Sequence, residues 1–199
     1  SSATADWPEP TEAEDLDAGD LSRAPQELRS ARLVIQTPRP AHAGALVVSI
    51  NASFHTLGFI SWAQVPRDLA WAERFCHRAG ERMAAGECLL YHAFDATTGD
   101  YVGGIDLHTF DFEAPRAEIG YVGDVRHAGR GLMREAALAV MAIGFGLGLA
   151  RIHALSDVRN ARALHFAVSL GMAREGLLRA YERDPQGALC DMVMFAAYN

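Results

Sequence analysis

The 199-residue chain contains no lysine, so all 18 of its basic residues are arginine. Its three cysteines, Cys76, Cys88 and Cys190, are far apart and match neither a disulfide framework nor a zinc-binding spacing. This pattern predicts a reducing, cytoplasmic location and no bound metal. Half of the residues are hydrophobic, but no apolar run approaches the roughly 20 residues that a membrane helix requires. We therefore expect no membrane association.

Negative charge is concentrated at the N-terminus. Residues 1–20 hold seven of the 25 acidic residues and no basic one, and the other 18 acids balance the 18 arginines. We predict that residues 1–29 form an acidic, disordered and solubilising tail, with a contact to a basic partner as the alternative. A neutral body lacks the basic face that nucleic-acid binding requires, so no nucleic-acid partner is expected.

Residues 30–199 have the alternating patterns of one mixed α/β domain. Apolar residues recur at helical spacing in four segments, 41–51, 67–84, 131–147 and 160–170. Strand patterns occupy seven segments, 32–37, 87–95, 101–110, 116–123, 151–155, 174–183 and 188–198. This order places a crossover helix between the fourth and fifth strands, and it predicts a layered sheet with helices against it.

The sequence VRHAGRGL at residues 125–132 separates the fourth strand from the third helix. It lacks the third glycine of a dinucleotide-binding fingerprint, and it lacks the Gly-Lys-Ser/Thr of a P-loop. A glycine-rich turn before a helix can direct several backbone N–H groups at one anion, where the helix dipole adds positive potential. Arg126, Arg130 and Arg134 can add guanidinium donors. The segment predicts a pyrophosphate-binding turn, and a surface turn with solvated arginines is the alternative.

The pattern Arg126-x-x-Gly129-x-Gly131 resembles the R/Q-x-x-G-x-G/A signature of the GNAT superfamily of acetyl-CoA-dependent N-acetyltransferases. Four further segments resemble the RimJ/RimL-type branch, which acetylates ribosomal-protein N-termini: AEIGY at 117–121, NARAL at 160–164, LGM at 170–172 and EGLLR at 175–179. The resemblance covers about residues 30–199. One short glycine motif is weakly specific, but the ordered set of segments is strongly specific.

The resemblance implies an α/β (α+β) GNAT fold. That fold has a mixed, mostly antiparallel sheet of six to seven strands, splayed between strands 4 and 5 and flanked by about four helices. Acetyl-CoA is the implied co-substrate, and its implied binding residues come from the fourth strand, the turn and the fourth helix: Tyr121, Val122, Gly123, Arg126, His127, Ala128, Gly129, Arg130, Gly131, Leu132, Asn160 and Phe166. For Phe166, a plain core position is the alternative.

The implied reaction is direct transfer of acetyl to a primary amine, which is either a protein N-terminus or a small molecule. Glu118 is the expected general base, acting through a water, or else a binding group for the substrate ammonium. A surface ion pair with Arg116 is the structural alternative. Ala163 replaces the serine that the family usually has, so the proton donor to the leaving thiolate is left open between Tyr121, Tyr181 and water. A non-catalytic acyl-CoA-binding module is the alternative function, and a homodimer is compatible with the family.

Overall fold

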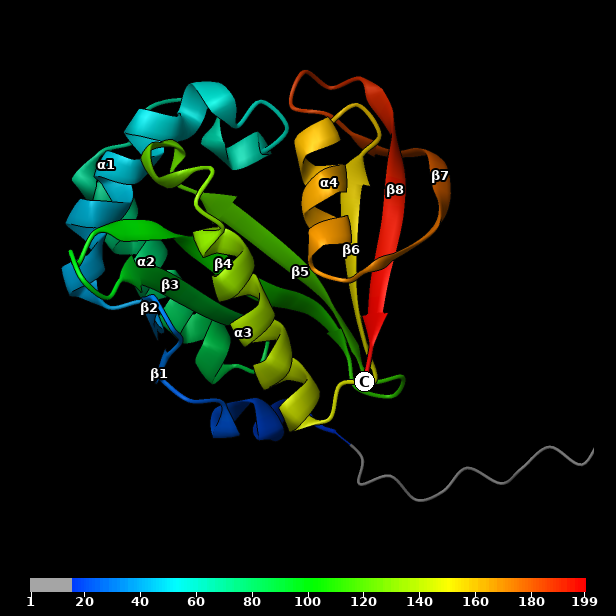
Figure 1. The fold of residues 1–199 in the computed structure, drawn as a ribbon, viewed down its shortest axis with the longest axis horizontal. Helices are drawn as coiled ribbons and strands as arrows, with labels where there is room; N and C mark the ends of the chain where they lie inside the picture. The colour runs from blue at the N-terminus through cyan, green and yellow to red at the C-terminus, as the bar shows by residue number, and fades with distance from the viewer. Residues whose placement is uncertain (1–15) are drawn as a thin grey trace, which may run out of the picture.

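The computed structural model describes residues 16–199, and residues 1–15 of the predicted tail lie outside the described part. Eight strands form one sheet in the order β1-β2-β3-β4-β5-β6-β8-β7 (Figure 1). Their bounds are β1 Glu27–Arg29, β2 Leu33–Gln36, β3 Leu89–Asp95, β4 Tyr101–Asp111, β5 Arg116–Gly123, β6 Arg151–Asp157, β7 Ala173–Arg183 and β8 Leu189–Tyr198. Only β5 and β6 pair in parallel among these strands. The mixed, mostly antiparallel fold class is confirmed.

The four predicted helices are present within about two residues of their expected bounds, as α1 Ala43–Ser53, α2 Leu69–Ala84, α3 Leu132–Leu147 and α4 Ala161–Ser169. Side-chain caps fix two of the starts. Asp68 accepts a hydrogen bond from the Trp71 backbone N–H at 2.8 Å, and Asn160 accepts one from the Ala163 N–H at 3.2 Å. None of the helices in the described residues is long and apolar enough to cross a membrane.

The sheet has one strand more than the six to seven expected, because β1 pairs antiparallel with β2 ahead of the first predicted strand. The prediction of disorder is therefore wrong for residues 16–29. Leu16 and Leu21 are only 4% and 3% exposed and belong to the main core. Between them Asp17 and Asp20 form a capping box for the short 3-10 helix Ala18–Arg23. The acidic composition of the segment suggested disorder, although two of its leucines are buried and two of its acids cap a helix.

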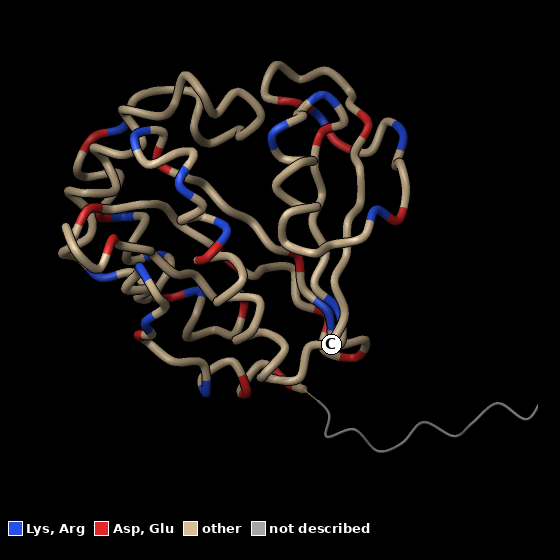
Figure 2. The backbone as a smooth tube through the Cα atoms, in the orientation of Figure 1, with Lys and Arg blue, Asp and Glu red and all other residues tan. Residues whose placement is uncertain are grey.

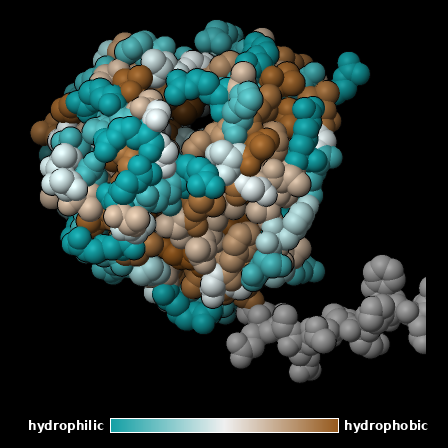
Figure 3. Space-filling view, in the orientation of Figure 1, coloured by the Kyte–Doolittle hydropathy of each residue, from teal (hydrophilic) through white to brown (hydrophobic). Residues whose placement is uncertain are grey.

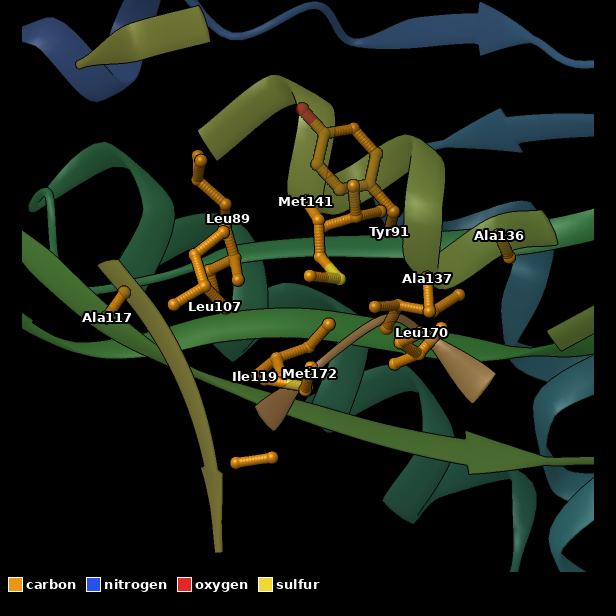
Figure 4. Close-up of a cluster of buried hydrophobic side chains, with 14 of the residues drawn as sticks. Leu89, Tyr91, Leu107, Ala117, Ile119, Ala136, Ala137, Met141, Leu170 and Met172 are labelled. Carbon is orange, nitrogen blue, oxygen red and sulfur yellow. The ribbon is translucent and has the colours of Figure 1, made fainter. Parts of the chain in front are cut away.

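The main hydrophobic core lies between α3 and one face of the sheet (Figure 4). Leu107 and Ile119 rise from β4 and β5 toward Ala136, Ala137 and Met141 of α3 (Figure 4). The small residues of α3 allow the helix to lie close to the strands. A smaller core on the opposite face joins α1, α2 and the start of β4. Helices thus cover both faces of the sheet.

The sheet opens between β5 and β6, as Figure 1 shows. The two strands pair only through residues 116–118 and 151–153. Beyond that point β5 stays paired with β4 as far as Gly123, while β6 stays paired with β8 as far as Asp157. Each strand follows its outer neighbour, so the two inner edges separate. This confirms the predicted splay between the fourth and fifth predicted strands, which are β5 and β6 here.

Candidate active site

A cleft of about 830 Å³ occupies the opening between β5 and β6. Its walls include residues 118–123 of β5, the turn that follows, the first residues of α3, residues 154–157 of β6 and the start of α4. Figure 3 shows this side of the molecule hollowed between the α1–α2 connection and α4. The cleft therefore joins the glycine-rich turn on one side of the sheet to Glu118 on the other.

Asp124 fixes the start of the turn. Its carboxylate is buried and accepts hydrogen bonds from the Arg126 backbone N–H at 2.8 Å and from the Arg126 guanidinium at 2.6 and 3.0 Å. Burial opposes ionisation of Asp124, but the bonds from Arg126 and Ser49 outweigh it and lower the pKa of this carboxyl. The next N–H, that of Val125, donates to the Ser53 hydroxyl of α1 at 3.0 Å. The turn is thus tied to α1 and to its own aspartate.

The two glycines of the turn both have left-handed backbone conformations, with φ +81° at Gly129 and +73° at Gly131. Gly131 is the N-cap of α3 and makes no side-chain cap bond. In the part of the chain that the structure describes, the N–H groups of Gly129 and Gly131 have no hydrogen-bond acceptor. Together with the orphan N–H groups of the first turn of α3, they form a set of donors beside the cleft.

The three arginines of the motif do not act alike. The Arg126 guanidinium is held by Asp124, and that of Arg130 lies 3.4 Å from the Asp95 carboxylate. Neither side chain lines the cleft, whereas Arg134 does and also donates to the Ser169 carbonyl at 2.9 Å. Arg32 reinforces the turn from outside, because it donates to the Arg130 carbonyl at 2.8 Å. The cleft side of the turn is accordingly made of backbone donors and one arginine.

The other residues implied by the resemblance line the cleft together: Tyr121, Val122, Gly123, His127, Ala128, Gly129, Gly131, Leu132, Asn160 and Phe166. Phe166 of α4 packs on Tyr121 of β5 with ring centroids 4.4 Å apart. Phe166 also contacts the main core, so it is both a core residue and a wall of the cleft. Burial raises the pKa of Tyr121 to about 12.

Glu118 is the last residue of β5 that pairs with β6, so it lies where these two strands begin to separate, and it lines the cleft. It makes no ion pair with Arg116, whose guanidinium instead lies 2.8 Å from Asp111. Two histidines flank it: Nε2 of His108 is 3.6 Å and Nε2 of His153 is 3.8 Å from Glu118 Oε2. The surface-pair alternative for Glu118 therefore fails, and its surroundings are two imidazoles and the cleft.

Two further walls of the cleft carry no sequence motif. One is the α1–α2 connection, with Thr56, Leu57, Phe59 and Ile60, and the other is the β7–β8 turn at residues 182–185. Arg159 joins the second wall to β6, since its guanidinium pairs with Asp157 at 2.6 Å and with Asp184 at 3.0 Å. Asp184, Pro185 and Gly187 are typical turn residues. The position of this turn beside the cleft depends on the pairing of β7 with β8.

The described residues contain no group of three or more His, Cys, Asp or Glu side chains that could hold a metal ion. Arginines and acids are interspersed along the backbone, without one large basic face in the view of Figure 2. The glycine-rich turn, with its free backbone N–H groups, is the candidate place in the cleft for an anionic ligand.

Comparisons with a family model and with related sequences all identify acetyltransferases. The model of the acetyltransferase (GNAT) domain matches residues 32–173. An uncharacterized N-acetyltransferase, p20 of Bacillus licheniformis, is 31% identical over 130 residues, which are 65% of this chain and 72% of that protein. Another, YoaA of Bacillus subtilis, is 34% identical over 85 residues, or 42% of this chain and 48% of that protein.

Solved structures show the same fold. The microcin C7 self-immunity acetyltransferase MccE, in complex with acetyl-CoA and AMP, superposes with a TM-score of 0.79 at 17% identity, over 85% of this chain and 94% of its own. RimL, a ribosomal L7/L12 alpha-N-protein acetyltransferase in complex with coenzyme A, superposes with a TM-score of 0.77 at 20% identity. The match covers 88% of this chain and 97% of that one. The match of the family model over most of the folded residues, with this sheet and turn, shows that the chain belongs to the GNAT acetyltransferase family.

Proposed function

We propose that this protein transfers an acetyl group from acetyl-CoA to a primary amine, either a protein N-terminus or a small molecule. The observation that carries the proposal is the continuous cleft through the splayed sheet, which has unpaired backbone donors at one end and the Glu118 carboxylate at the other. These are the two groups that such a reaction needs: a holder for the cofactor phosphates and an acceptor for the proton of the amine.

The turn would bind the pyrophosphate of acetyl-CoA. Backbone N–H groups of Gly129, Gly131 and the first turn of α3 would point their positive ends at the anion, and Arg134 would add a charged donor. The pantetheine arm would lie between β5 and β6, where the strands leave each other unpaired beyond Glu118 and His153. Backbone groups near Tyr121, Val122 and Gly123 would pair with it, and a backbone N–H there would stabilise the oxyanion.

The amine would enter from the side of Glu118. As the neutral amine attacks the thioester carbonyl, the C–N bond forms, the C–S bond breaks, and the sulfur leaves as a thiolate. Glu118, directly or through a water, accepts the proton that the nitrogen must lose. An α-amine has a pKa near 8, so only a modest push is required.

A covalent acetyl-enzyme is disfavoured by the one cysteine that lines the cleft. Burial, followed by the nearby Asp157, raises the pKa of the Cys190 thiol, so this group stays protonated and is a poor nucleophile. All three cysteines are free and buried, which supports the expected reducing cytoplasm. The proposed reaction is therefore direct transfer within a complex of protein, acetyl-CoA and amine.

Tyr121 is the stronger tyrosine candidate for the proton donor to the thiolate. It lines the cleft, its hydroxyl has no hydrogen-bond partner in the described part of the chain, and a pKa of about 12 keeps it protonated. Tyr181 is 52% exposed and does not line the cleft. We expect Tyr121→Phe, which keeps the packing on Phe166, to lower kcat about tenfold without changing the affinity for acetyl-CoA. An unchanged kcat would leave water as the donor.

The direct test of the function is amine-dependent release of free CoA. The protein is incubated with acetyl-CoA and a panel of primary amines, from N-terminal peptides to small amines, and thiol release is followed together with the mass of the products. We expect one acetyl group to appear on the amine for each CoA released. Binding of acetyl-CoA without acetylation of any amine would favour the alternative of a non-catalytic acyl-CoA-binding module, for which Ala163 is the main argument.

A further inference from the structure

An Asp–His pair next to Glu118 is not explained by cofactor binding. Asp106 and His108 lie on β4, and His108 is directly opposite Glu118 of β5. The Asp106 Oδ2 and His108 Nδ1 atoms are 2.7 Å apart, and the other ring nitrogen, Nε2, is 3.6 Å from Glu118 Oε2. One imidazole thus connects two carboxylates across neighbouring strands.

Gly120 provides the space for this arrangement. It lies opposite Asp106 in the β4–β5 register. A Cβ atom at position 120 would be 2.5 Å from Asp106 Oδ1 and 3.4 Å from His108 Cε1. Any larger residue would push the Asp106 carboxylate off the sheet surface, and the bond that orients the ring would be disturbed.

The charge of His108 is fixed by its neighbours. Its contacts with Asp106 and then Glu118 outweigh partial burial and raise its pKa to about 10, so the ring is an imidazolium at neutral pH. On the other side of Glu118, burial lowers the pKa of His153, whose buried Nδ1 has no hydrogen-bond partner among the described residues. Glu118 therefore lies between one cationic and one neutral imidazole.

Both rings approach the same oxygen of Glu118, Oε2. A carboxylate whose Oε2 is held by a cation loses rotational freedom, and its Oε1 remains available to a group in the cleft. The distance of 3.6 Å is that of an ion pair rather than a formed hydrogen bond, and contacts of this kind commonly tighten in the substrate complex.

We infer that Asp106 and His108 are positioning residues for Glu118: Asp106 orients the His108 ring, and the ring anchors Oε2 so that Oε1 faces the amine. This inference rests on the proposed function of Glu118. The other charged and titratable groups that act on Asp106, Glu118 or His153 come from β5, β6, β7 and the residue before β3: Arg116, Arg151, Glu182 and Cys88. Among residues 16–199, only Asp106 forms a hydrogen bond with the His108 ring.

Three variants test the inference in the full chain. We expect His108→Gln to lower kcat about tenfold with unchanged affinity for acetyl-CoA, and His108→Lys, which keeps a positive charge, to recover most of the loss. In Asp106→Asn, His108 loses its main stabilising partner, so it deprotonates at a lower pH, and kcat should fall on the alkaline side where the wild type stays level. His77→Gln is the matched control, because its ring lies 3.7 Å from Glu81 on the exposed face of α2, away from the cleft.

NMR titration of the His108 ring without substrate gives a readout that does not depend on turnover. We expect the wild-type ring to stay protonated through pH 8 and its midpoint to fall in both Asp106→Asn and Glu118→Gln. A wild-type midpoint near 6.5, or His108→Gln with wild-type kcat and pH profile, would overturn the inference while leaving the transferase function intact. Absence of acetyl transfer in the wild type would instead refute the function itself, and the role of the pair with it.

Discussion

Replacement of Gly129 by glutamate is expected to weaken acetyl-CoA binding by about 100-fold or more. Two effects add. A residue with a Cβ pays about 1–2 kcal/mol in the left-handed conformation, which position 129 has at φ +81°, so the free turn of the variant relaxes and binding must restore that conformation. The new carboxylate also brings negative charge to the place where the pyrophosphate must lie, which costs a further 1 kcal/mol or more at an effective dielectric of about 20. Together, roughly 3 kcal/mol corresponds to about 100-fold in affinity.

Calorimetric titration of acetyl-CoA and of free CoA measures this effect. Gly187→Glu is the matched control, because Gly187 has φ +87° and open space around its would-be Cβ, as Gly129 has, but it lies in the β7–β8 turn. It carries the same backbone cost and the same added charge, and Gly187 does not itself line the cleft. Equal affinities in Gly129→Glu and Gly187→Glu would show that the glycine-rich turn is not the phosphate site.

Glu118→Gln is expected to lower kcat by about 100-fold, since removal of a positioned general base typically costs 100-fold or more. The glutamine keeps the size of the side chain but cannot accept the proton of the amine. The affinity for acetyl-CoA should not change, because the donors of the turn belong to the other end of the cleft. Steady-state kinetics at saturating acetyl-CoA, together with calorimetry, separate the two quantities.

The pH dependence of the Glu118→Gln variant sharpens this test. Without the carboxylate, transfer depends on amine that is already deprotonated in solution, so the residual rate should rise toward the amine pKa near 8 and above. Amine binding to Glu118 without proton transfer would give a different result. In that case KM for the amine would rise, while kcat would stay within a few-fold of the wild type.

Much of the fold was predictable because its signals are local. The four helices follow from apolar spacing, and the caps at Asp68 and Asn160 fix two of them from side chains next to the helix start. Gly, Asp and Pro residues between the strand patterns predict the hairpin turns. β1 was missed because three residues are too few to show an alternation, and its existence depends on pairing with β2. The burial of Leu16 was not predicted, because its sequence neighbours are acidic.

The candidate site was predictable where one segment contains both the chemistry and the geometry. The glycine-rich turn is such a segment, since both of its glycines are left-handed and line the cleft. The direction of Arg130 depends on a distant partner, Asp95 at the end of β3, and Arg32 of the N-terminal region donates to the Arg130 carbonyl. The role suggested for His108 depends on cross-strand register with Glu118, which no single stretch of sequence contains.

We propose that acetyl passes from acetyl-CoA in the β5–β6 cleft directly to an amine on the side of Glu118. Intact-mass analysis tests it with protein in excess over acetyl-CoA, with and without an accepted amine. We predict that acetyl-CoA remains intact until the amine is added, that the acetyl group then appears on the amine, and that the protein mass never changes. An acetylated protein that forms without the amine and passes its acetyl group on would contradict direct transfer, and acetyl-CoA that stays intact with every amine would contradict the transferase assignment.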